Sequence, residues 1–137
     1  MDTVAALVED QSLLGFARFA TMVFFAIVFL QSGVDKITDQ EGNQSYFRDV
    51  FKNAPMLQSL TGPLFWGLTL LELGAGIFCG LGILFDTFAV WGIQLATLAL
   101  LALIFGQRMA KDYAGAAVVA TYMAVALVGN LIVALSS

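Results

Sequence analysis

The chain has 137 residues, of which 60% are hydrophobic and only 12% charged, and its mean hydropathy is +0.89. Soluble domains carry about 25% charged residues, so this chain has roughly half the charge that a water-exposed surface requires. The composition excludes a soluble enzyme and a disordered segment. The pI near 4.4 and the lack of a basic run argue against a nucleic-acid partner.

Four apolar stretches predict four membrane spans, at about 13–33, 63–84, 87–105 and 113–135. Each is about 20 residues long, which an α-helix needs to cross the hydrocarbon core of a bilayer. The predicted fold is therefore an all-α membrane protein, a four-transmembrane-helix bundle that forms one integral membrane domain over 1–137. The first span has neither the basic lead nor the cleavage site of a signal peptide, so we expect it to be retained.

The only substantial polar region lies between the first two spans, at 34–62. Within it, apolar residues recur at helical spacing. They are Tyr46, Phe47, Val50, Phe51 and Ala54. This pattern predicts a short amphipathic helix at the membrane interface, and an ordered loop is the alternative.

An even number of spans places both termini on one side of the membrane and the two polar connections, 34–62 and 106–112, on the other. The connection side carries five basic residues, whereas the terminal side has only Arg18, which already lies inside a span. By the positive-inside rule, the connections are predicted to be cytoplasmic and the termini external.

Two ionisable residues lie inside the predicted spans, Arg18 in the first and Glu72 in the second. Such a group costs about 2.5–3.5 kcal/mol at the membrane centre on insertion scales, so it usually faces the bundle interior and finds a partner. We expect Arg18 and Glu72 to line a polar pocket that holds a quinone or a small anionic group, or relays protons. The alternatives are an arginine that snorkels to the interface and a glutamate that burial keeps neutral.

Small and polar residues in the other spans predict helix packing. Gly76 and Gly80 form a GxxxG spacing, which lets two helix backbones approach closely. Gln94 and Asn130 lie inside the third and fourth spans, where each is expected to hydrogen-bond to a neighbouring helix.

Five charged residues border the spans on the connection side, and we expect them to form an ion cluster or to contact a partner. They are Asp35, Lys36, Arg108, Lys111 and Asp112. Exposed ion pairs stabilise little, so the predicted role is to orient the connections. Histidine is absent and Cys79 is the single cysteine, so the sequence predicts no metal site.

Two of the spans resemble those of the DoxX-like family. In that family an early arginine in the first helix precedes a Gly-x-x-Lys at its exit, and the second helix combines a glutamate with glycines. The matching residues are Arg18, Gly33 and Lys36 in FARFATMVFFAIVFLQSGVDKI, and Glu72, Gly76 and Gly82 in LLELGAGIFCGLGIL. The family's frequent histidine near the end of the third span is missing, as is its glycine-rich terminal signature.

The resemblance implies a four-helix bundle in the bacterial cytoplasmic membrane. Family members are linked to sulfur oxidation with quinone as acceptor or to redox stress, which would place Arg18 and Glu72 near a quinone head. We therefore expect a small accessory subunit of a larger electron-transfer complex, without activity of its own, which contacts other subunits, structural lipids and a possible quinone. The alternative is a quinone-reducing membrane component. A small transporter is less favoured, because paired repeats and broken helices are absent.

Overall fold

The computed structural model describes residues 11–136, which form helices joined by short turns and contain no strand. Four helices in this range are long and apolar enough to cross a membrane. They are α2 (Gln11–Thr38), α5 (Thr61–Gly82), α6 (Asp86–Met109) and α7 (Tyr113–Ser136). The predicted all-α four-helix membrane bundle is confirmed.

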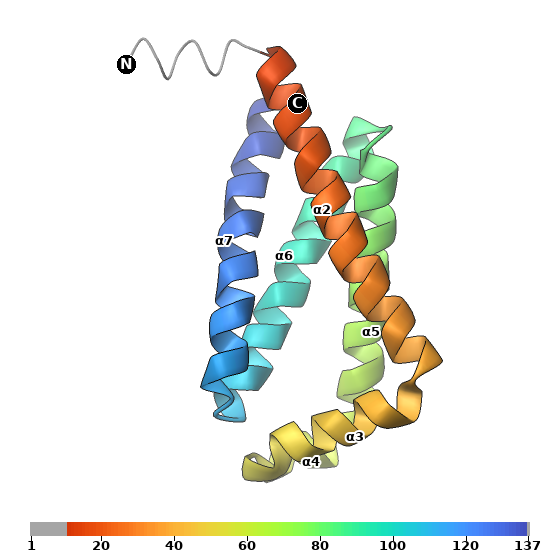
Figure 1. Ribbon diagram of the computed structural model, residues 1–137, viewed down its shortest axis with the longest axis vertical. Helices are drawn as coiled ribbons and strands as arrows, with labels where there is room; N and C mark the ends of the chain where they lie inside the picture. Colours follow the sequence, from red (N-terminus) through yellow and green to blue (C-terminus); the bar gives the residue numbers. More distant parts are fainter. Residues whose placement is uncertain (1–10, 137) are drawn as a thin grey trace.

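The four long helices form an up-and-down bundle (Figure 1). Helix α5 packs against both α2 and α6, and α7 packs mainly against α6. Helix α2 begins and α7 ends at the same end of the bundle, while the connection between α2 and α5 closes the opposite end (Figure 1). Helices α2 and α7 diverge toward that opposite end, which we call the loop end.

Helix α2 continues to Thr38, five residues beyond the predicted end of the first span. Its 28 residues correspond to about 42 Å at 1.5 Å per residue, longer than the hydrocarbon core of a bilayer. Buried residues recur every three or four positions along this helix. The stripe runs through Met22, Phe25, Phe29, Gly33 and Lys36. The added turn thus places the last of them, Lys36, on the inner face of the bundle.

The polar connection folds as three short helices across the loop end, which we call the cap (residues 40–59). They are α3 (Gln40–Val50), the 3₁₀-helix η1 (Phe51–Asn53) and α4 (Pro55–Ser59). The cap therefore begins earlier than the predicted interfacial helix, because Asp39 accepts a hydrogen bond from the Gly42 amide and starts α3 there.

Apolar contacts hold the cap on the spans. Phe51 and Leu57 bury against Ala110 in the α6–α7 turn. The ring of Phe47 meets that of Phe65 on α5 edge-to-face, with centroids 5.7 Å apart. The cap is therefore part of the bundle's packing rather than a free loop.

Glycines set how closely the spans approach. A Cβ on Gly76 would lie 2.8 Å from the Leu30 backbone nitrogen, and one on Gly92 would lie 2.7 Å from that of Cys79. Gly76 therefore allows α2 and α5 to pack backbone to backbone. Gly80, the other member of the expected pair, has open space where its Cβ would be, so it does not serve this packing.

We predict that Gly92→Ala lowers the free energy of unfolding by about 1–3 kcal/mol, because the added methyl overpacks the α5–α6 contact. Gly80→Ala is the matched control and should raise stability by about 0.5–1 kcal/mol through helix propensity alone. Thermal unfolding in a mild detergent measures both. Equal effects of the two substitutions would contradict the packing described here.

Candidate functional site

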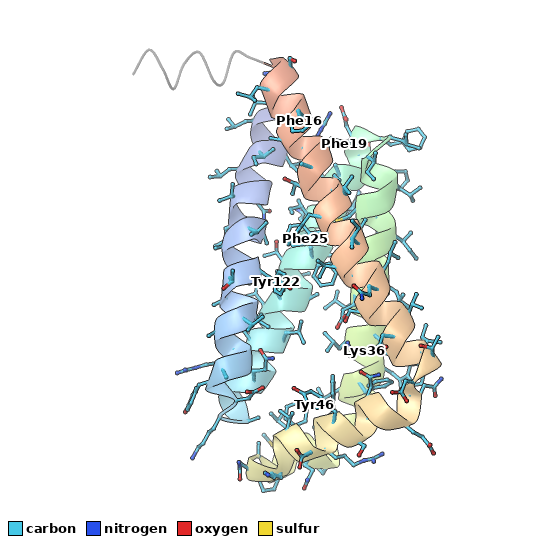
Figure 2. The ribbon with its side chains drawn as sticks, in the orientation of Figure 1. Phe16, Phe19, Phe25, Lys36, Tyr46 and Tyr122 are labelled. Carbon is cyan, nitrogen blue, oxygen red and sulfur yellow. The ribbon has the colours of Figure 1, made fainter. Side chains whose placement is uncertain are left out.

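The best-defined polar site in the bundle is an ion pair between Lys36 on α2 and Glu72 on α5. The lysine Nζ lies 3.1 Å from Glu72 Oε1 and donates a hydrogen bond to Oε2 at 3.3 Å. It also donates to Ser32 Oγ at 2.9 Å. The Glu72 side chain is 1% exposed and that of Lys36 is 10% exposed. Figure 2 shows Lys36 on the side of α2 that faces α5.

Helix geometry explains why these two residues meet. Glu72 belongs to the buried stripe of α5, three residues after Thr69 and four before Gly76. Lys36 follows Gly33 on the corresponding stripe of α2. Gly76 brings the two backbones together beside Leu30, about one helical turn from Glu72, so the pair forms next to a close approach of α2 and α5.

One cavity lies beneath this ion pair, between the cap and the loop end of α5 and α6. This cap cavity has a volume of about 480 Å³. Its walls are mainly apolar, and a few polar side chains also line it. They are Lys36, Asn43, Tyr46, Gln107 and Asp112. In Figure 2, Tyr46 rises from α3 toward the spans.

A second cavity lies between α2 and α7, where the two helices diverge. This α2–α7 cavity has a volume of about 470 Å³ and is more polar than the first. Its lining includes Gln31, Ser32, Asp35, Glu72 and Tyr122. Glu72 therefore borders the α2–α7 cavity whereas Lys36 borders the cap cavity, so the ion pair forms part of the wall between them.

Arg18 and Glu72 do not line one polar pocket, which corrects the expectation from the sequence. Arg18 Nη1 lies 2.7 Å from Asp86 Oδ1, at the first residue of α6. Asp86 is favoured there because a carboxylate at a helix N-terminus complements the helix dipole. The two ionisable residues of the predicted pocket thus belong to separate ion pairs, Arg18 at the terminal end and Glu72 toward the loop end.

Of the two polar residues expected to hydrogen-bond between spans, Asn130 does so and Gln94 does not. Asn130 Nδ2 donates to Thr97 Oγ1 at 3.0 Å, which links α7 to α6, and to the Ala126 carbonyl at 2.7 Å. Gln94 is exposed on α6 and does not form the expected hydrogen bond to a neighbouring span among the described residues.

The expected ion cluster at the connections does not form within the described residues. Lys36 turns inward because α2 extends past it. Arg108 instead stacks over the Tyr113 ring at 4.7 Å, and Asp112 accepts from the Gly115 amide at the start of α7. Lys111 forms the α6–α7 turn with φ of 61°, and Asp35 borders the α2–α7 cavity.

Sequence reasoning placed Lys36 at the surface, although the signal for its burial was present. The residue continues the three- and four-residue spacing of the apolar positions in the first span, one turn past its predicted end. A lysine in register with a buried stripe indicates an internal partner. The carboxylate on the neighbouring span, Glu72, is that partner.

Comparison with protein families identifies the chain. A family model described as methylamine utilisation protein MauE matches residues 14–115, from the first turns of α2 into the start of α7. The chain belongs to the MauE family. The expected class, a small membrane-protein family, is confirmed, but the family is MauE and not the DoxX-like one. Comparisons with curated proteins and with solved structures found no match.

Together, the family and the four apolar helices identify a multi-pass membrane protein. Within residues 11–136, no group of three or more His, Cys, Asp or Glu side chains lies close enough to hold a metal ion. The chemistry offered by the site is that of the ion pair. Both carboxylate oxygens of Glu72 face the single ammonium of Lys36, at 3.1 Å and 3.3 Å, so the carboxylate keeps unused acceptor capacity.

Removing one residue of the ion pair should lower the free energy of unfolding more than removing both. We predict that Lys36→Met lowers the free energy of unfolding by about 3–5 kcal/mol, because it leaves a buried carboxylate without its counter-ion. The double variant Lys36→Met, Glu72→Leu should recover most of this loss. A double-mutant cycle in detergent measures the coupling, and additive losses would show that the two residues do not interact.

Proposed function

We propose that this chain is a non-catalytic accessory protein of the cytoplasmic membrane that acts with other proteins of a methylamine-utilisation pathway. Membership of the MauE family is the observation that carries the proposal. The family description names methylamine utilisation, and the setting that we propose within it is electron transfer. The chain contributes a scaffold to it rather than a redox centre.

The distribution of charge supports a scaffold that meets partners at the loop end. Exposed charged residues gather on the cap and the α6–α7 turn, whereas the long helices are exposed mainly through apolar side chains. The cap charges include Glu41, Arg48, Asp49 and Lys52. A cap of mixed charge that packs on the spans suits specific, oriented contact with another protein, because complementary charges fix register. By the positive-inside rule this face is cytoplasmic.

The proposal predicts a conditional growth defect. Deletion of the gene in its host should abolish growth with methylamine as sole nitrogen source and leave growth with ammonium unchanged. The intact gene, supplied in trans, should restore growth. Equal growth of the deletion strain and the parent on methylamine would contradict the proposal.

The accessory role also predicts stable association. Extracted from native membranes of methylamine-grown cells, the chain should migrate on a native gel together with proteins whose abundance rises on methylamine. Reversal of the cap charges (Arg48→Glu with Lys52→Glu) should break this association. Asn130→Ala, which lies inside the bundle, is the control that should leave it intact. Migration of the wild-type chain by itself would contradict the accessory role.

A quinone contact is the second candidate, and the α2–α7 cavity favours it. The cavity has a volume of about 470 Å³, within the range of about 300–1,000 Å³ typical of small-molecule sites, and the carboxylate of Glu72 borders it. Glu72 would then hydrogen-bond a quinol hydroxyl or accept its proton. The sequence analysis placed Arg18 in the same pocket as Glu72. Because Arg18 pairs with Asp86 at the other end of α2, it would take no part in this quinone contact.

Under the quinone hypothesis, Glu72→Gln should abolish the methylamine-dependent reduction of membrane quinone per amount of folded chain, a normalisation that is needed because the substitution also leaves Lys36 without its counter-ion. The substitution keeps the shape of the side chain but removes its charge. Gln94→Leu, on the exposed side of α6, is the control. Unchanged quinone reduction in Glu72→Gln membranes would exclude this candidate.

A further inference from the structure

The turn between α6 and α7, at the loop end, carries two exposed cations (Figure 1). They are Arg108, in the last turn of α6, and Lys111, in the turn itself. Neither forms an ion pair within residues 11–136. The neighbouring carboxylate, Asp112, is half-buried and accepts a hydrogen bond from the Gly115 amide at the start of α7. The surface of the turn is therefore positive.

The other basic residues of the chain each have a polar side-chain partner. On the cap, Lys52 Nζ lies 3.9 Å from a carboxylate oxygen of Asp49, and Arg48 donates a hydrogen bond to the Gln44 side chain. The two basic residues inside the bundle pair with carboxylates of other helices. Within the described residues, the α6–α7 turn is thus the place where two cations are left for a ligand.

Arg108 is held in position by a contact that needs no hydrogen bond. Its guanidinium carbon lies 4.7 Å from the centre of the Tyr113 ring, a cation–π contact. Its N–H groups have no hydrogen-bond acceptor in the part of the chain that the structure describes. A guanidinium with free N–H groups binds an oxyanion through two parallel hydrogen bonds, which makes arginine a preferred ligand of phosphate.

Lys111 adopts a backbone conformation that suits glycine better. Its φ is 61°, the one positive φ outside glycine within residues 11–136. Helices often end with a glycine in this left-handed conformation, because a Cβ there is strained. The side chain is exposed, so packing does not compensate for the strain. The dipole of α6 favours a cation at this end, but Arg108 already supplies one. A functional role for the second charge would account for the lysine.

The turn lies at the depth of the lipid phosphates. The 24 residues of α6 correspond to about 36 Å, whereas the hydrocarbon core of a bilayer is about 30 Å thick. One side of α6 is apolar and exposed, through Leu98, Leu101 and Phe105. Arg108 continues their three- and four-residue spacing, so it ends this lipid-facing side of the helix. Acyl chains along α6 would therefore lead to a phosphate beside Arg108.

We infer that Arg108 and Lys111 bind the phosphate of an anionic phospholipid, such as phosphatidylglycerol, whose acyl chain lies along Leu101 and Phe105. The Lys111 amide donates to the Arg108 carbonyl at 3.1 Å, so both long side chains start from one turn. A zwitterionic head would bring an ammonium beside two cations, which is unfavourable. This lipid contact goes beyond the proposed function, whose test places the protein partners on the cap.

Native mass spectrometry of the full chain in an uncharged detergent tests the site. The chain is mixed with phosphatidylglycerol and phosphatidylcholine that have the same acyl chains, and the adducts with one lipid are compared. The wild type should prefer phosphatidylglycerol. Arg108→Gln and Lys111→Gln should each lower its affinity about fivefold, the effect of one cation at the membrane surface. Lys52→Gln removes the same charge from the cap and should keep the wild-type preference.

Lys111→Gly separates lipid binding from folding. Glycine relieves the strain at this φ, so the thermal midpoint should rise while the affinity for phosphatidylglycerol falls about fivefold. A higher midpoint with unchanged lipid affinity would overturn the role of Lys111. An unchanged preference for phosphatidylglycerol in the double variant Arg108→Gln, Lys111→Gln would overturn the whole site.

Two further measurements test the class of ligand. Inorganic phosphate in excess should leave the phosphatidylglycerol adduct in place, and its displacement would overturn the lipid assignment in favour of a soluble anion. On a native gel, the double variant should migrate with the same proteins as the wild type. If it loses these proteins but keeps the lipid preference, the turn is a protein contact and the inference is wrong. The lipid measurement uses the purified chain without partners, so its failure is distinguishable from failure of the proposed function.

Discussion

The ion pair between Lys36 and Glu72 sets the arrangement of this membrane bundle. Removal of two charges from water is costly, and only close geometry with further hydrogen bonds compensates for it. Here Ser32 supplies one such bond, and the glycine at 76 lets the two backbones approach. Because a shift of one residue would separate the charges inside a nonpolar medium, the pair fixes the register of α2 against α5.

This register determines the shape of the rest of the protein. With Lys36 held inward at the end of α2, the chain turns at Asp39 and runs across the loop end as the cap. Phe47 and Phe51 then pack on α5 and the α6–α7 turn, and both line one cavity there. On the other side of the pair, the divergence of α2 and α7 leaves the second cavity. One polar contact thus borders both spaces in which a ligand could lie.

Hydropathy and length were sufficient to predict the four spans, because a bilayer admits few alternatives to long apolar helices. The partners of the charged residues were harder to predict. Glu72 was recognised as a group inside a span, but the predicted end of the first span at residue 33 left Lys36 in a loop and placed Arg18 in the same predicted pocket as Glu72. Periodicity carried the missing information, since Lys36 is in register with Phe25 and Phe29. Asn43 and Gln107 gave no such signal, because the cavity they line exists only once the cap folds back on the spans.

A solid-state NMR measurement of the distance between Lys36 and Glu72 in lipid bilayers would test the central claim most directly. The chain has three lysines and three glutamates, and this is the only Lys–Glu ion pair within residues 11–136. Dipolar dephasing between ¹⁵Nζ-labelled lysine and ¹³Cδ-labelled glutamate should therefore be strong in the wild type and absent in Glu72→Gln. Absence of dephasing in the wild type would show that the ion pair does not form, and the register and cavities derived from it would have to be abandoned.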